Sequence, residues 1–126
     1  MTTSPKHKRG YAMHELSIAL SILDGAEEEM RHRTGRVTAV HLKLGRLCGV
    51  VKEALLSSFE MARDGTALSQ AELLIEEIPL VLHCPICAAD GSPESLYELR
   101  CPTCGAPTNE IVRGRELEIC ALEIEP

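Results

Sequence analysis

The sequence contains no tryptophan, one phenylalanine and two tyrosines among 126 residues, so its core must consist of aliphatic side chains. It also lacks an excess of basic residues, because 13 lysines and arginines stand against 19 acidic residues and give a formal net charge of −6. Proteins bind nucleic acid through basic surfaces and, for single strands, through aromatic stacking. Both are scarce here, and we do not expect nucleic acid as a partner.

Long apolar runs are absent as well, since none approaches the roughly 18 residues of a membrane-spanning helix. Residues 1–12 are polar, carry three positive charges and are not followed by an apolar segment, which excludes a secretory signal peptide. We therefore expect a cytoplasmic protein with no membrane contact, whose residues 1–12 form a disordered arm. In a reducing compartment its six cysteines should bind metal rather than form disulfides.

Hydrophobic periodicity predicts an α+β fold, in which a three-stranded sheet is packed by two helices and carries an inserted four-Cys zinc-ribbon domain. The expected domains are residues 13–82 with 114–126, and an insert over 83–113. The expected order of elements is a helix from Leu16 to Thr34-Gly35, a strand over 36–44, a helix from Val51 to Ala62, a strand over 71–82, the insert and a strand over 115–124.

Three details of this fold are open to a direct check. Pro79 cannot donate to a sheet ladder, so an edge or a bulge is expected there. In the last strand the apolar alternation changes parity between Ile119 and Leu122, which indicates a bulge near Ala121. The apolar stripe of the first helix is assigned to Leu16, Ala19, Leu20, Leu23, Ala26 and Met30.

Four of the cysteines form two Cys-x-x-Cys pairs separated by 13 residues, namely Cys84, Cys87, Cys101 and Cys104. A two-residue gap lets both thiolates of a pair face one ion, and two such loops complete the tetrahedral sulfur shell that Zn²⁺ accepts. Four thiolates leave no position for water, so the zinc is expected to be structural. Gly105 follows the second pair, where a left-handed residue is often needed.

The remaining cysteines and two histidines have weaker interpretations. Cys48 and Cys120 are interpreted as small buried residues in a turn and a strand, and the alternative is a role as accessory thiols or a crosslink. His83 adjoins Cys84 and is either an alternate zinc ligand or a flanking polar residue. His41 is expected on the surface of a strand.

A series of motifs runs through the rest of the chain and resembles one known family. The segment Met13-His14-Glu15-Leu16-Ser17-Ile18-Ala19 opens the first helix, and Gly45-Arg46-Leu47 closes the first strand. Gly49-Val50, the two cysteine pairs and Gly114-Arg115-Glu116-Leu117-Glu118-Ile119 follow. In this order they resemble the hydrogenase nickel-incorporation proteins of the HypA/HybF family, over residues 13 to about 124.

The resemblance implies a nickel metallochaperone that delivers Ni²⁺ to the metal centre of nickel–iron hydrogenase. It implies that Met13, His14 and Glu15 bind Ni²⁺ as transient cargo, while the four cysteines bind structural Zn²⁺. It also implies two partners, a nickel-handling GTPase and the hydrogenase large subunit. The sequence leaves open whether the chain forms a homodimer.

The sequence departs from the family pattern at its beginning, because the family motif starts at the chain terminus and supplies a free amine. Twelve residues precede Met13 here. One interpretation is that translation starts at Met13. A second is that the arm is genuine and that nickel binds through the His14 imidazole and other donors, with His7 as an extra candidate. The third is that the nickel function has been lost.

Catalytic patterns are absent, because we find no Ser-His-Asp set, phosphate-binding loop or paired carboxylates. We therefore expect a metal carrier that is not an enzyme. The alternative function is a zinc-ribbon protein-interaction or regulatory module without nickel binding. A redox-active cysteine pair is a weaker alternative, because no thioredoxin-like βαβ pattern surrounds the two pairs.

Overall fold

The computed structural model describes the backbone of residues 4–126 and the side chains of residues 14–126. It divides into unit 1, residues 1–42, 50–75 and 119–126, and unit 2, residues 43–49 and 76–118. The elements are α1 (Ser4–Glu29), β1 (Arg36–Gly45), the short 3₁₀ helix η1 (Arg46–Cys48), α2 (Lys52–Ala62), β2 (Glu72–Ile78), β3 (Val81–Cys84), β4 (Ala89–Gly91), β5 (Ile111–Arg113) and β6 (Leu117–Glu125). The insert predicted at 83–113 lies within unit 2.

The predicted α+β fold is confirmed. One three-stranded sheet has the order β2-β1-β6, and a smaller one has the order β4-β3-β5. Arg36 pairs with Glu125 while the Gly45 N–H donates to the Glu116 carbonyl, so β6 runs antiparallel to β1. The expected strand over 71–82 is divided into β2 and β3, and the division falls at Pro79 and Leu80, where the proline cannot donate to a ladder.

The beginning of α1 differs from the sequence prediction. Residues 4–12 were expected to be a disordered arm, but α1 begins at Ser4 and its backbone is continuous through the Met13-His14-Glu15 segment. Ser-Pro is a favoured helix start, since serine suits the cap position and proline the first turn. After Pro5 the only poor helix former before Met13 is Gly10, at a cost of about 1 kcal/mol. Residues 1–3 lie outside the described residues.

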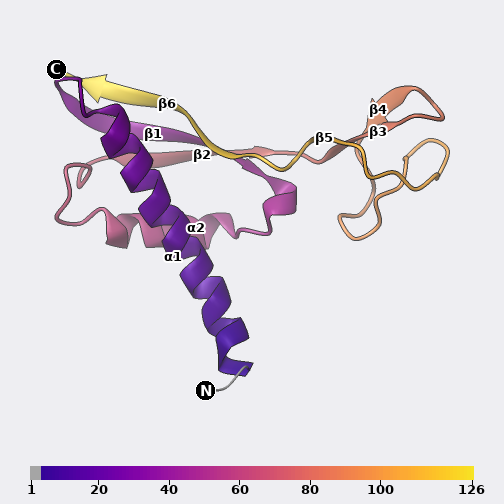
Figure 1. Cartoon of the computed structure of the whole chain (residues 1–126), viewed down its shortest axis with the longest axis horizontal. Helices are drawn as coiled ribbons and strands as arrows, with labels where there is room; N and C mark the ends of the chain where they lie inside the picture. Colours follow the sequence, from indigo (N-terminus) through magenta and orange to yellow (C-terminus); the bar gives the residue numbers. More distant parts are fainter. Residues whose placement is uncertain (1–3) are drawn as a thin grey trace. The chain divides into compact units, whose positions relative to one another are not determined.

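The core of unit 1 is aliphatic apart from Phe59, as the composition requires. In Figure 1 α1 crosses α2 obliquely, and α2 lies below the strands of the sheet. The buried face of α1 differs from the predicted stripe, because Leu16 and Leu20 are 36% and 48% exposed. The core side chains of α1, α2 and the sheet are Ile18, Ala19, Ile22, Leu23, Ala26, Val37, Val40, Leu42, Leu55, Phe59 and Leu73, joined by Leu68 and Ala71.

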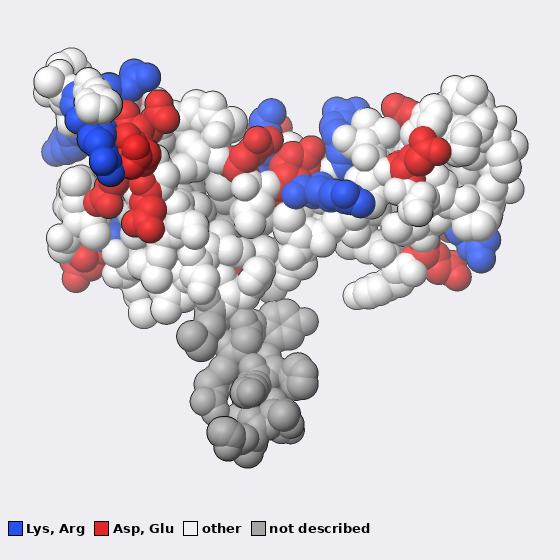
Figure 2. Space-filling view, in the orientation of Figure 1, with Lys and Arg blue, Asp and Glu red and all other residues white. Residues whose placement is uncertain are grey.

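The last turn of α1 and the turn after it carry charged side chains on the surface. Arg31 donates to Glu28 over 2.7 Å, and Arg33 lies 3.7 Å from Glu29. Figure 2 shows this end of the molecule as adjacent acidic and basic side chains. All four side chains are more than half exposed, so each pair contributes little to stability.

Strand β6 is less buried than the alternation of its sequence predicts. Ile119 and Leu122 both contact the core of unit 1, although they are three positions apart, whereas Leu117 and Ile124 are 41% and 36% exposed. In a regular strand, residues three positions apart face opposite sides. The contact of both Ile119 and Leu122 with the core therefore agrees with the predicted change of alternation along β6. The bulge near Ala121 itself stays a prediction.

Candidate metal centre

The four cysteines of unit 2 converge on one point. Their Sγ atoms all lie within 4.8 Å of one another, with 3.7 Å between Cys84 and Cys104 and 3.9 Å between Cys87 and Cys101. Zn–S bonds of about 2.3 Å in a tetrahedron place sulfur atoms about 3.8 Å apart. The cluster therefore fits a structural zinc ion. Among the side chains that the structure describes, no other group of three or more metal-ligating residues comes together in this way.

Each cysteine pair sits on a tight turn that aims backbone N–H groups at sulfur. The Cys87 N–H donates to Cys84 Sγ over 3.4 Å, and the Cys104 N–H donates to Cys101 Sγ over 3.5 Å. The residue after each pair has a positive φ, 53° at Ala88 and 78° at Gly105. The left-handed residue predicted at Gly105 is thus confirmed, and the first loop achieves the same turn with alanine.

These turns perturb the acidity of two thiols in opposite directions. Backbone N–H groups of Cys104 and Thr103 stabilise the thiolate of Cys101 and lower its pKa to about 6. Hydrogen bonds with Cys104 and Cys101 raise the pKa of Cys87 to about 12. A cluster without metal therefore keeps protons among its sulfurs, and zinc binding must release them.

The two ends of the cluster differ in their access to solvent. Cys84 and Cys101 are 2% and 6% exposed, whereas Cys104 is exposed. A hollow of about 460 Å³ lies beside Cys101 and Cys104 and is also lined by Glu94, Glu98 and Arg100. An ion in the cluster would be approached from the side of Cys104.

His83 lies beside this cluster but faces a different partner. It is opposite Asp90 in the antiparallel pairing of β3 with β4, and its Nδ1 lies 2.7 Å from Asp90 Oδ1. That contact supports the interpretation of His83 as a flanking polar residue. His41 is half-buried on β1 in unit 1, and its Nε2 lies 2.6 Å from Glu123 Oε2.

The residues expected to bind nickel lie on α1, in unit 1, and they have contrasting environments. The side chain of Met13 is outside the described residues. His14 is exposed to solvent. Glu15 is only 3% exposed, and its Oε2 accepts a hydrogen bond of 3.2 Å from the backbone N–H of Val51.

The contact of Glu15 matters because α2 has no cap of its own. Val51 is the N-cap residue of α2 and offers no side-chain oxygen to the free N–H groups of the first turn. The carboxylate of Glu15 supplies the missing acceptor, together with the negative charge that a helix N-terminus favours. Sequence reasoning missed this role of Glu15. Two features of the sequence indicate this role. Glu15 has the helical spacing of the buried residues of α1, and no capping residue precedes Lys52.

Comparisons with known proteins agree with this arrangement. A family model described as "Hydrogenase/urease nickel incorporation, metallochaperone, hypA" matches residues 13–124. The chain belongs to the HypA family. A hydrogenase maturation factor HypA of Chloroflexus aurantiacus is 48% identical over 112 residues, which cover 88% of this chain and 98% of the relative.

Solved structures extend the likeness to the fold. The solution structure of the Ni metallochaperone HypA from Helicobacter pylori has a TM-score of 0.63 and 24% identity, and the match covers 87% of this chain and 96% of that one. A second HypA solution structure has a TM-score of 0.67 and 25% identity, over 90% of this chain and 97% of that one. As a HypA protein, the chain is a nickel metallochaperone of hydrogenase maturation.

Two motifs that pointed to the HypA family meet in unit 2. The Gly45 N–H donates to the carbonyl of Glu116 over 2.6 Å, and the Leu47 N–H donates to the carbonyl of Gly114 over 2.8 Å. Cys48 Sγ adds contacts of 3.3 and 3.2 Å to the carbonyls of Arg115 and Glu116. Gly45-Arg46-Leu47 and the Gly114-Arg115-Glu116 segment are therefore two sides of one backbone junction.

The interpretation of Cys48 and Cys120 as buried residues is wrong. Cys48 is half-buried at the junction of these motifs, and Cys120 is exposed on β6. On β6 the residues packed against the core are Ile119 and Leu122, and Cys120 is not among them. Both thiols are free, and they belong to different units of the chain.

Proposed function

We propose that this HypA protein carries Ni²⁺ on the segment Met13-His14-Glu15 and delivers it to the metal centre of a nickel–iron hydrogenase. The observation that supports this most is the placement of His14, an exposed imidazole next to a buried glutamate that holds the segment against α2. Imidazole nitrogen is a good donor for Ni²⁺. His14 is thus the ligand, Met13 contributes main-chain donors, and Glu15 fixes the position of both.

Main-chain donors are restricted in the full-length chain. Met13 and His14 lie within the helix, where each N–H donates to the carbonyl four residues earlier. Nickel bound through these nitrogens would have to unwind that turn. The His14 imidazole, which needs no unwinding, is therefore the main donor, and a weak site of this kind suits an ion that must be released.

The zinc cluster has a different task. Cys84, Cys87, Cys101 and Cys104 hold a structural Zn²⁺ that folds unit 2, because an insert of mixed loops and strands of three or four residues has little apolar area to bury. Nickel residues in unit 1 and zinc residues in unit 2 make two functional domains of one chain. None of these roles requires catalysis, so the protein is not an enzyme.

The proposed setting is the cytoplasm, with a nickel-handling GTPase and the hydrogenase large subunit as partners and with no nucleic acid. Within the described residues no helix has the length and apolar character to cross a membrane. A homodimer is compatible with the exposed edge strand β6, whose unpaired side could receive a second copy.

Nickel titration of zinc-loaded protein tests the nickel site. His14→Ala should weaken Ni²⁺ binding at least tenfold, whereas His32→Ala, which removes an exposed histidine after the end of α1, should leave it unchanged. A form that starts at Met13 should bind more tightly than the full chain, because its terminal amine and first amides are free. Equal affinities of the wild type and His14→Ala would favour the alternative, a zinc-ribbon interaction module without nickel function.

A further inference from the structure

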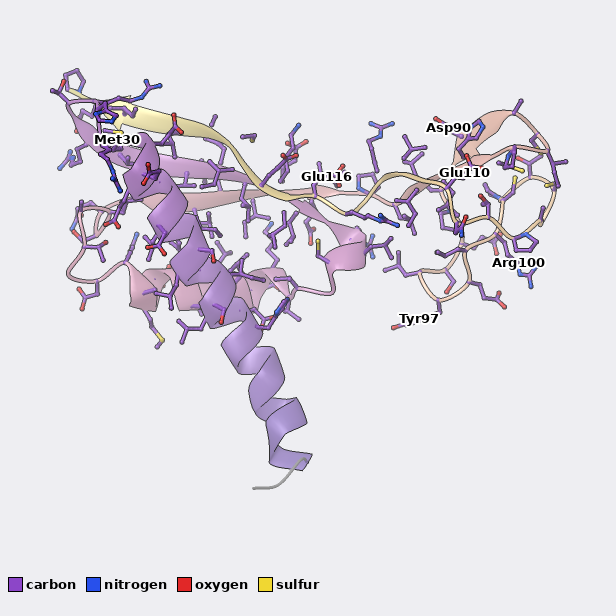
Figure 3. The ribbon with its side chains drawn as sticks, in the orientation of Figure 1. Met30, Asp90, Tyr97, Arg100, Glu110 and Glu116 are labelled. Atoms are coloured by element: carbon purple, nitrogen blue, oxygen red, sulfur yellow. The ribbon has the colours of Figure 1, made fainter. Side chains whose placement is uncertain are left out.

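The structure places two of the chain's three aromatic side chains in opposite environments. Phe59 is 1% exposed in the core of unit 1, whereas Tyr97 in unit 2 is 96% exposed. Figure 3 shows Tyr97 projecting from its loop, away from the cysteine sulfurs and from Arg100. In a protein this poor in aromatics, a tyrosine presented to solvent on the loop between the cysteine pairs is an unusual use of a large apolar side chain.

The loop holds Tyr97 in a defined position. An antiparallel bridge joins Ser95 to Glu98 and closes a tight turn, and the Tyr97 N–H donates to Ser95 Oγ over 3.0 Å. Behind the turn the Arg100 N–H donates to the Glu98 carbonyl over 3.0 Å. An ordered turn of this kind reduces the conformational entropy lost when its side chains are covered by another molecule.

The surroundings of the ring combine apolar area with negative charge. Leu96 is 37% exposed beside Tyr97, and the carboxylates of Glu94 and Glu98 are exposed on either side. Neither carboxylate takes part in an ion pair with another described residue. Residues 94–98, which we name the Tyr97 tip, are therefore an apolar projection bordered by two exposed carboxylates that are not in ion pairs, with Arg100 lining the same hollow as both.

We propose that the Tyr97 tip docks this protein to the hydrogenase large-subunit precursor, in an apolar pocket of the precursor that is rimmed by lysine or arginine. Tyrosine is enriched among the residues that dominate interface energies, and facing charges of opposite sign speed the encounter. The proposal rests on the proposed function, which makes this precursor the recipient of nickel. The tip belongs to unit 2 and His14 to unit 1, so docking and nickel binding use different units of the chain.

Binding of purified, zinc-loaded protein to the purified precursor tests the docking site. Tyr97→Ala should weaken the affinity at least tenfold, the loss expected at a dominant interface residue. Tyr97→Phe should retain affinity within about threefold, since the ring supplies most of the contact. Met61→Ala is the matched control, because Met61 is also a highly exposed apolar residue (74%) but lies on α2 in unit 1, and it should bind as the wild type does. Glu94→Gln with Glu98→Gln should slow association and reduce its dependence on salt.

Zinc content and nickel affinity of each variant are measured in parallel, and both should equal those of the wild type. Equal precursor affinity of Tyr97→Ala and the wild type would overturn the proposal, as would absence of wild-type binding. A matching loss in binding of the partner GTPase, or in self-association, would also overturn the choice of precursor. If His14→Ala leaves nickel binding intact while Tyr97→Ala still loses the precursor, the nickel site is refuted and the docking site stands.

Discussion

Replacing Glu15 with alanine should destabilise unit 1, although the residue lies next to a proposed nickel ligand on the helix that opens the chain. The carboxylate is 3% exposed and accepts the Val51 N–H at the beginning of α2, where the helix has no side-chain cap of its own. Alanine removes that acceptor from a buried position. The N–H of Val51 is then left without its partner, and the N-terminus of α2 loses the charge that complements its dipole.

The decrease in the free energy of unfolding caused by Glu15→Ala is the sum of these two losses. An unsatisfied buried donor costs about 1–3 kcal/mol, and Val51 is 53% exposed, so water replaces part of the bond and the lower end applies. The charge at a partly buried helix N-terminus adds about 0.5–1 kcal/mol. We expect a loss of about 2 kcal/mol from the free energy of unfolding. For a chain of this size that loss lowers Tm by about 6–10 °C.

Glutamine separates the two contributions. Glu15→Gln keeps an oxygen that can accept from Val51 but removes the charge, so its loss should stay below about 1 kcal/mol. Glu60→Ala, which removes an exposed carboxylate from α2, is the control and should change stability by no more than about 0.5 kcal/mol. Urea unfolding followed by far-ultraviolet circular dichroism, with zinc held constant, gives all three values. If Glu15→Ala matches Glu60→Ala, the carboxylate does not cap α2.

Two further predictions concern unit 2. Cys84→Ser and Cys104→Ser should each lose the single zinc ion, as measured by metal analysis. Each substitution should disorder the insert while α1, α2 and the sheet stay folded. Retention of one zinc per chain would contradict the four-sulfur site. Gly114→Ala should lower the free energy of unfolding by about 2–3 kcal/mol, because φ is +119° and a Cβ would lie 2.9 Å from the Leu80 Cα. Gly49→Ala is the control, since φ is +69° there and the space around it is open. In the same unfolding measurement it should cost about 1 kcal/mol.

The cysteine cluster was predictable from the sequence because its geometry is local. Two residues between Cys84 and Cys87 determine how both thiolates face one point, and the same holds for Cys101 and Cys104. The only long-range contact that the site needs is between the loops of the two cysteine pairs, and one zinc ion bound by both loops holds them together. No comparable rule connects Gly45 to Glu116, whose contact depends on how β1 and β6 pair. The sequence marks both segments, but only the fold brings them together.

The buried face of α1 was harder to predict, because the helix carries apolar residues on more than one side. Leu16 and Leu20 fit a helical stripe as well as Ile18 and Ile22 do, and periodicity alone cannot choose between the two sets. Glu15 resolves the choice, for a buried carboxylate must have a partner, and the free N–H groups at the start of α2 offer one. The face that holds Glu15 against α2 also turns Ile18 and Ile22 inward and leaves His14 on the exposed side. The polar residue least expected in a core therefore sets the orientation of the helix, and with it the exposure of the proposed nickel ligand.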